Sequence, residues 1–394
     1  MDDSGLQTET GGAPMKAGAD DRWASYVQVT DEVFPTFLQD HAASRDKSRK
    51  VCLIMGKGFD PRMLGGLKAL RQVFPATKTV VILLVFDEGP TSPSRRYDQR
   101  VQQNVTELTT IVPHDQIEER QITMFSTDGR RVTSRSAESV VRSADELQQF
   151  SDVFVDVSSL PRGVYFPVVA KLLFLLDGIK NGLTPNLFVL VSESTALDER
   201  IVEEGIDEDA DYIHPFRGAV ERESAADRPR VWFPLLGENQ HIQLTRIYDL
   251  INPAEICPLL PSPSVDPRRG DNLVLEYRGL LFDQLQLETS NFIYASETNP
   301  FEVYRQLKRA ILHYAEALRP LGGSNAVISA NSSKLLSVGA LLAAYEIKRA
   351  GTDIAIAHVE AHGYSVRNSE GDDLDRLASE SRLHCLWLSG ECYA

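Results

Sequence analysis

Cysteine is scarce in this chain, and its spacing predicts neither a metal site nor a crosslink. The 394 residues include four cysteines, and the closest two in sequence, Cys385 and Cys392, are seven positions apart. That spacing fits neither a zinc knuckle nor a redox CxxC motif. Cys52 lies inside an apolar run, where a thiol is typically a small buried hydrophobe. We therefore expect no metal or cofactor, and a reducing, cytoplasmic location.

Long hydrophobic runs are also missing. A membrane-spanning helix needs about 20 consecutive apolar residues, and the longest candidate, residues 164–176, is shorter and contains Lys171. The N-terminal stretch MDDSGLQTETGGAPMKAGADD is polar and lacks the basic-then-apolar pattern of a secretory signal. We expect no membrane association, a disordered tail over residues 1–22 and a helical lead-in over residues 23–50.

Positive charge is in the minority. The chain has 41 Lys and Arg against 56 Asp and Glu, for a net charge of −15. Binding of long DNA or RNA depends on many neutralised phosphates, so this balance argues against a general nucleic-acid binder. A small anionic ligand remains compatible with it, provided that particular arginines or lysines form a local pocket.

Strand-like and helix-like segments alternate along the chain in two series. The length allows about two domains of roughly 100–200 residues each. The strand-like runs of the first series are 51–55, 79–86, 122–125, 153–157 and 187–191, and those of the second are 231–236, 256–260, 292–295, 326–329 and 354–358. This alternation predicts an α/β protein with two Rossmann-like parallel-sheet units in tandem, over residues 51–225 and 226–394.

Three local matches indicate that the second unit repeats the first. They are Pro75-Ala76 with Pro253-Ala254 after the first helix, Arg95-Arg96 with Arg268-Arg269 after the second strand, and Ser158-Ser159 with Ser332-Ser333 after the fourth strand. The last two matches have offsets of 173 and 174 residues. The shared order predicts an internal duplication, a pseudo-dimer whose halves have one strand order. The alternative is two unrelated α/β domains with similar strand ends.

The segments after the first and fourth strands carry the candidate ligand-binding residues. In open parallel sheets, ligands lie beyond the carboxyl ends of the strands, where helix N-termini favour anions. Glycines there allow close approach, hydroxyls donate hydrogen bonds and cations bind phosphate or carboxylate. The candidates are Gly56, Lys57, Gly58, Asp60 and Arg62 in GKGFDPR, Asp156, Ser158, Ser159 and Arg162 in DVSSLPRG, and Asn331, Ser332, Ser333 and Lys334 in ANSSK.

Each of these motifs also has a purely structural interpretation. Either serine pair is a standard N-cap for the apolar helix that follows it. Asp156 closes a buried strand, where it is expected either to cap the next helix or to pair with Arg162. In the second unit, GEN at 237–239 stands where the first unit has the basic GKG, so we expect the two units to be functionally unequal.

A Rossmann-like unit with a small-residue loop after strand one and a Ser–Lys/Arg motif after strand four resembles the CARF domains of CRISPR-associated defence proteins. Two such units in one chain resemble the SAVED arrangement, over roughly residues 50–365. The resemblance implies a cyclic oligonucleotide bound between the halves, with the 56–62 loop as one wall. The residues that it places in the pocket are Ser158, Ser159, Arg162, Ser332, Ser333 and Lys334.

Two functions from different classes follow. The resemblance implies a sensor of a nucleotide signal in a prokaryotic defence or signalling system, which acts through a partner effector because no nuclease, protease or TIR segment is recognised in the chain. The alternative is a ring nuclease, nucleosidase or sugar-phosphate enzyme that uses Asp60, Asp156 or Arg162. The sequence offers no committed nucleophile or metal set, which favours binding.

Overall fold

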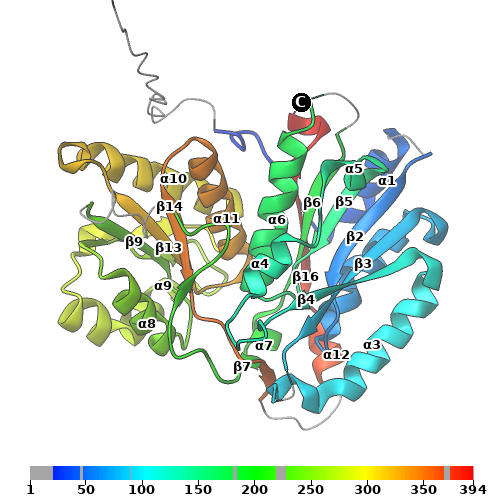
Figure 1. Cartoon of the computed structure of the whole chain (residues 1–394), viewed down its shortest axis with the longest axis horizontal. Coiled ribbons are helices and arrows are strands. Elements are labelled where there is room, and N and C mark those ends of the chain that lie inside the picture. The colour runs from blue at the N-terminus through cyan, green and yellow to red at the C-terminus, as the bar shows by residue number, and fades with distance from the viewer. Residues whose placement is uncertain are drawn as a thin grey trace, which may run out of the picture.

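The computed structural model describes residues 21–44, 48–89, 91–180, 184–218, 228–367 and 373–393. Residues 1–20 of the predicted tail lie outside these ranges. Two sheets stand side by side, with helices between them and on their outer faces (Figure 1). Within the described ranges, the helices are too short or too polar to cross a membrane.

The first sheet has the strand order β1-β16-β6-β5-β2-β3-β4. Its parallel strands are β2 (Lys50–Gly56), β3 (Thr79–Asp87), β4 (Ile117–Thr123), β5 (Phe150–Asp156) and β6 (Asn186–Glu193). The helices that connect them are α2 (Gly65–Arg71), α3 (Asp98–Ile111), α4 (Thr133–Glu138), α5 (Ala144–Gln148) and α6 (Arg162–Asp177). All seven residues of β5 are buried, as expected for a parallel strand with helices on both faces of its sheet.

The second sheet has the order β12-β11-β9-β13-β14-β8, with β10 (Glu255–Ile256) also paired to β9. Its parallel strands are β9 (Arg230–Leu235), β11 (Leu259–Pro261), β12 (Ile293–Ala295), β13 (Asn325–Ala330) and β14 (Ile354–His358). The connecting helices are α8 (His241–Ile251), α9 (Arg269–Glu276), α10 (Pro300–Ala317) and α11 (Lys334–Arg349).

Both halves have the same topology. When the parallel strands are numbered within each half, both sheets follow the order 3-2-1-4-5, which is the Rossmann order. The helix after the fourth strand has 16 residues in each half, α6 in one and α11 in the other. The predicted fold class is confirmed, and the shared strand order agrees with an internal duplication.

The two halves share one central apolar core. Helices α6 and α11 contact each other between the sheets (Figure 1). Residues of both halves form a continuous buried cluster around them. Helix α6 is buried on nearly all sides, because a helix that is apolar all round has no face to offer to water. At Gly339 of α11, a Cβ atom would clash with the start of α10, so glycine is needed for this close packing. The halves therefore form a single body.

One strand of each sheet is supplied by the other part of the chain. Strand β8 (Asp211–Tyr212) follows the first five strands in sequence but pairs antiparallel with β14. Strand β16 (Arg382–Ser389) follows the second five but pairs antiparallel with β6. The crossing segments meet in a two-stranded ribbon, β7 (Ile201–Glu203) with β15 (Tyr364–Val366). The predicted domains meet between residues 225 and 226, but β8 and β16 each belong to the sheet on the other side of that boundary.

The segment expected to be a helical lead-in contains β1 (Val27–Thr30), which pairs with β16, and then α1 (Phe34–Ser44). Trp23 is fully buried, its Nε1 donates to the carbonyl of Leu388 at 3.0 Å, and its ring meets that of Tyr304 edge-on at 5.1 Å. Asp21 accepts from Lys308 at 2.6 Å, and Arg22 pairs with Asp177 at 2.7 Å. The expectation of a tail to residue 22 is wrong for Asp21 and Arg22, because these contacts hold them against both halves.

We expect Trp23→Ala to lower the free energy of unfolding by about 3–5 kcal/mol, because it opens a cavity between β16 and α10. Denaturant unfolding of the purified variant measures this. A chain that lacks residues 1–20 is the control, and we expect it to keep the wild-type midpoint. An unchanged midpoint for Trp23→Ala, or loss of folding in the truncated chain, would contradict these assignments.

Candidate functional site

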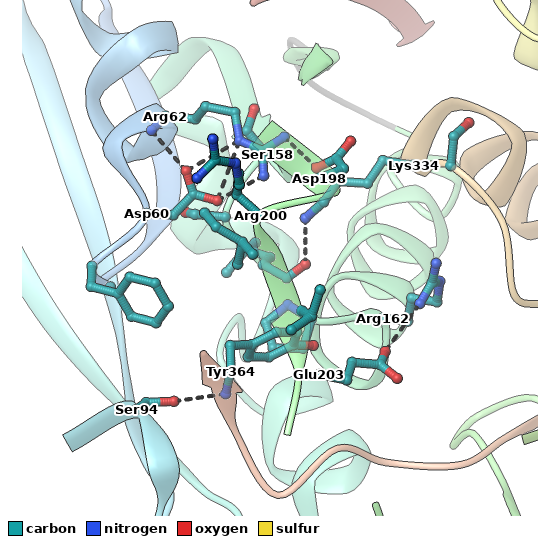
Figure 2. Close-up of a pocket in the computed structure, with 18 of the residues that line it drawn as sticks. Asp60, Arg62, Ser94, Ser158, Arg162, Asp198, Arg200, Glu203, Lys334 and Tyr364 are labelled. Carbon is teal, nitrogen blue, oxygen red and sulfur yellow. Dashed lines mark hydrogen bonds and ion pairs between the residues drawn. The ribbon is translucent and has the colours of Figure 1, made fainter. Parts of the chain in front are cut away.

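An open cavity of about 990 Å³ lies where the carboxyl ends of the two sheets face each other, and the β7·β15 ribbon contributes to its wall (Figure 2). This is the position expected for a ligand in open parallel sheets. The structure places most of the predicted site residues on its wall, eleven of the thirteen: Lys57, Gly58, Asp60, Arg62, Ser158, Ser159, Arg162, Asn331, Ser332, Ser333 and Lys334.

The other two, Gly56 and Asp156, lie behind the wall. A Cβ atom on Gly56 would lie 2.6 Å from Leu160 Cδ2, so this glycine allows the first loop to pack on the serine turn. Asp156 is buried, and its Oδ1 accepts from the backbone N–H of Ser158 at 3.0 Å and from the Ser158 hydroxyl. Burial raises the pKa of Asp156 to about 6. Its partner is thus Ser158 rather than Arg162, and its contacts stabilise the turn.

Asp60 and Arg62 hold the first loop in shape. Arg62 donates to both carboxylate oxygens of Asp60, at 3.1 and 2.8 Å, and to Asp198 at 2.7 Å (Figure 2). Burial alone would raise the pKa of Asp60, but the Arg62 guanidinium lowers it below its usual value. Asp60 is therefore an ionised partner of a buried cation, and Asp198 is the second residue that pairs with that cation. Neither Asp60 nor Arg62 is free to act on a ligand without breaking this network.

The two serines of DVSSLPRG have different surroundings. Ser158 is fully buried, its hydroxyl donates to Asp156, and it accepts from the backbone N–H of Ser192 at 2.8 Å. These bonds fix the carboxyl ends of β5 and β6 to each other. Ser159 is half-buried on the cavity wall, so it is the serine of this pair that is exposed to a ligand.

Arg162 and Lys334 connect the halves. Arg162, the first residue of α6, donates to the carbonyl of Ser332 and lies 3.6 Å from Glu203. Lys334, the first residue of α11, donates to the carbonyls of Val157 at 2.8 Å and Leu160 at 2.9 Å. Each of these two residues thus starts the central helix of its own half, and its side chain binds the serine turn of the other half.

Two glutamates occupy matching positions at the starts of the central helices. Glu193, the last residue of β6, accepts from the backbone N–H of Leu335 at 3.0 Å, at the start of α11. Glu360, two residues beyond β14, lies against Gly163 at the start of α6, where a Cβ atom would clash with its carboxylate. Burial raises the pKa of both glutamates to about 7. The helix N-termini expected to hold a ligand's anion are therefore each approached by a carboxylate of the opposite half.

Each double-arginine loop places one arginine on the cavity wall, and the two arginines differ in their partners. Arg269 is held by Glu238 at 2.7 and 2.9 Å and by Glu297 at 2.5 Å, which neutralises it within the second half. Arg95 instead donates to the carbonyl of Gly89 at 2.9 Å. Its guanidinium is on the wall and is bonded to a neutral group, which makes it the more accessible of the two to an anionic ligand.

Residues after the fifth strands were not anticipated from the sequence. The segments after β6 and β14 bring Arg200, Glu203, Tyr364 and Arg367 to the cavity. The sequence could have indicated these residues, since SESTALDER (192–200) follows a buried strand in the same way as GKGFDPR does. Ligands lie beyond the carboxyl ends of the strands in open parallel sheets, and this applies to the fifth strand as it does to the first and the fourth.

The wall interleaves opposite charges. It carries eight Lys and Arg and nine Asp and Glu, together with aromatic rings such as Phe59 and Tyr364 and the carboxamides of Asn239, Gln240, Gln243 and Asn331. Cations suit phosphate, carboxylates suit ribose hydroxyls, and aromatic rings suit a base. The chemistry therefore fits a ligand with few anionic groups and several neutral polar ones better than a dense polyanion.

No family model matches the chain, and no curated protein matches it. Among solved structures, it is similar to one described as a universal stress protein of Pseudomonas aeruginosa, with 11% identity over 84% of this chain and 99% of that chain. The TM-score is 0.22. A likeness this low carries no argument for this chain.

We expect Glu193→Gln to stabilise the protein increasingly as pH rises from 5 to 8. The folded-state pKa of about 7 lies above the ordinary 4.5, so the folded protein retains this proton where the unfolded chain has lost it. Wild-type stability therefore falls through this window, whereas glutamine keeps the acceptor for Leu335 without the charge. Thermal unfolding of both proteins across the range measures the difference in melting temperature. A difference that is constant or shrinks with pH would refute the assignment.

We expect Arg162→Ala to lower stability by about 1.5–3 kcal/mol, the range for a hydrogen bond to a charged group, because it removes the bond to Ser332 of the other half. The matched control is Arg130→Ala, whose side chain is 83% exposed and lies outside the cavity. Denaturant unfolding distinguishes the two variants. Equal midpoints would show that Arg162 does not hold the halves together.

Proposed function

We propose that this chain binds a nucleotide, or a related ligand with phosphate and polar groups, in the cavity between its halves. In this proposal it is a cytoplasmic sensor in a prokaryotic defence or signalling system and passes the signal to a partner effector protein. The observation that carries the proposal is the placement of both serine turns, from corresponding positions of two like-folded halves, on the wall of one cavity.

The size and chemistry of the cavity support a nucleotide. Small-molecule sites usually have volumes of about 300–1,000 Å³, and this cavity of about 990 Å³ is at the upper end of that range. Arg95 and Lys57 are positioned for phosphate, since the partner of Lys57 at 3.1 Å is Glu119, a half-exposed carboxylate that is not part of the wall. Tyr364 offers a ring surface for a base, and the Phe59 ring lies on the same wall, packed against Tyr97.

The contacts of the three candidate catalytic residues favour binding over the enzymatic alternative. Asp60 is the ion-pair partner of Arg62, Asp156 caps the serine turn, and Arg162 binds Ser332 and Glu203. A general acid, base or nucleophile must reach the reacting atom within about 2.6–3.2 Å. Asp60 and Asp156 would each first have to give up a contact that holds the fold.

The ribbon supports a signalling role. Glu203 in β7 contacts both Arg162 of the first half and Gln243 of the second, at 3.6 and 3.0 Å. In β15, the backbone N–H of Tyr364 donates to Ser94 at 3.1 Å, beside the first double-arginine loop (Figure 2). A ligand in the cavity would therefore touch the element through which the chain crosses to β8 and β16. That connection supplies a route from the cavity to β8, the edge strand of the second sheet, which a partner could contact.

The test is calorimetric titration of the whole chain with mononucleotides, linear dinucleotides and cyclic oligonucleotides. We expect at least one class to bind and Arg95→Ala to weaken its binding about ten- to a hundredfold, since one charge-assisted hydrogen bond contributes about 1.5–3 kcal/mol. The melting temperature of Arg95→Ala should stay unchanged because its bond to Gly89 is exposed.

Arg130→Ala is again the matched control and should bind as the wild type does. Absence of binding by all three nucleotide classes would overturn the proposed ligand. Binding that Arg95→Ala leaves intact would place the ligand outside this cavity.

A further inference from the structure

Lys334 is the amine on the cavity wall with the most unusual surroundings. Its Nζ donates to two backbone carbonyls, those of Val157 and Leu160. Among the residues that the structure describes, no carboxylate forms an ion pair with it. A buried ammonium normally requires such a partner, because hydration is lost and must be replaced. Two neutral carbonyls replace the lost hydration only in part.

The charged groups that face Lys334 come from several elements. Burial lowers its pKa first, and the cations Arg62 and Arg162 lower it further, against the opposing effect of the carboxylates of Asp60 and Asp198. The net result is a pKa of about 7. Lys334 is also the first residue of α11, where the positive end of the helix dipole disfavours a cation. On the remaining side, its Nζ lies 6.0 Å from the ring centroid of Tyr165.

The hydrogen-bond geometry suits a neutral amine. A neutral Lys334 has two N–H groups, and two carbonyl acceptors lie at 2.8 and 2.9 Å. Both donors are then satisfied, and the lone pair is left without a hydrogen bond on a side chain that lines an open cavity. Desolvation and a neighbouring cation are the conditions under which proteins make lysine a nucleophile.

We propose that Lys334 is a reactive amine that binds small anionic aldehydes covalently as an imine. The amine nitrogen attacks the carbonyl carbon, and proton transfer from nitrogen to oxygen gives a carbinolamine. Loss of water then forms the C=N bond, so one aldehyde and one amine give one imine and one water, with no oxidant or reductant. The nearby Arg162 guanidinium, whose side chain is 21% exposed, is placed to hold the anionic group of the aldehyde. This inference does not require that the natural ligand be a nucleotide.

Pyridoxal 5′-phosphate, an aldehyde that carries a phosphate, is a suitable probe for the wild-type chain. The protein is incubated with it at pH 7.5 and reduced with borohydride, and the modified lysines are located by peptide mass spectrometry. An ordinary lysine, of pKa about 10.4, is neutral in about one molecule in a thousand at this pH. We expect Lys334 to be modified at least about tenfold faster than the exposed Lys68, with a rate that rises to half its maximum near pH 7.

Two matched comparisons make the test specific. Lys68→Met should leave modification of Lys334 unchanged, whereas Lys334→Met should remove the fast phase. Pyridoxal, the same aldehyde without phosphate, should modify Lys334 at least about tenfold more slowly if an anion is held beside it. If Lys334→Met fails to fold, the modified lysines located in the wild-type chain by peptide mass spectrometry are sufficient to test the proposal. Modification that follows side-chain exposure, or a Lys334 rate that rises only near pH 10, would overturn the reactive amine, and equal rates with both aldehydes would overturn its preference for anions.

Discussion

The rest of the structure depends on the mutual burial of α6 and α11. Both helices follow the fourth strand of their sheet, and both are too apolar to leave one face in water. Packing them together buries that surface and sets the two sheets side by side with their carboxyl ends close together (Figure 1). The cavity is therefore a consequence of the core, because whatever holds the helices together also holds the two serine turns on one wall.

Reciprocal polar contacts fix this arrangement at its most buried point. Arg162 and Lys334 each bind the serine turn opposite, and Glu193 and Glu360 each approach the helix start opposite. A carbonyl is a weaker acceptor for the Arg162 guanidinium than a phosphate is, and a carboxylate of pKa about 7 is easily neutralised. The halves are thus joined by contacts that a ligand's anion can compete for. Under the proposed function, occupancy of the cavity is therefore linked to the fit between the halves.

The sequence was sufficient for the parts that depend on local pattern. Alternating apolar runs predicted ten parallel strands in two units, and the placement of DVSSLPRG and ANSSK after the fourth strands predicted that each lies at the carboxyl edge of its sheet. That the two motifs share one pocket was implied by the family resemblance alone. The strand predicted at residues 122–125 is β4, which begins earlier, at Ile117. It is an edge strand, and its polar residues EERQ (118–121) hide the strand pattern. The pairing of β8 and β16 with the sheet of the other half could not be predicted from the sequence, since a two-residue strand such as β8 has no periodicity.

The roles of individual site residues were harder to predict than their positions. Asp156 and Arg162 are six residues apart, so a local ion pair was a natural interpretation, but Arg162 contacts the other half instead. Sequence spacing reports which groups can meet within a turn. It contains no information on which turn of the other half lies within reach of a side chain. The packing of the two halves decides whether that side chain stabilises the fold, lines the cavity or does both.

The central claim is that one ligand is bound by both halves at once. Hydrogen exchange of the whole chain, with and without a nucleotide that binds, tests it most directly. The account predicts slower exchange on binding both in the backbone of residues 57–64 and 158–165 and in that of residues 331–337. Protection confined to one half, or to residues away from the cavity, would contradict it.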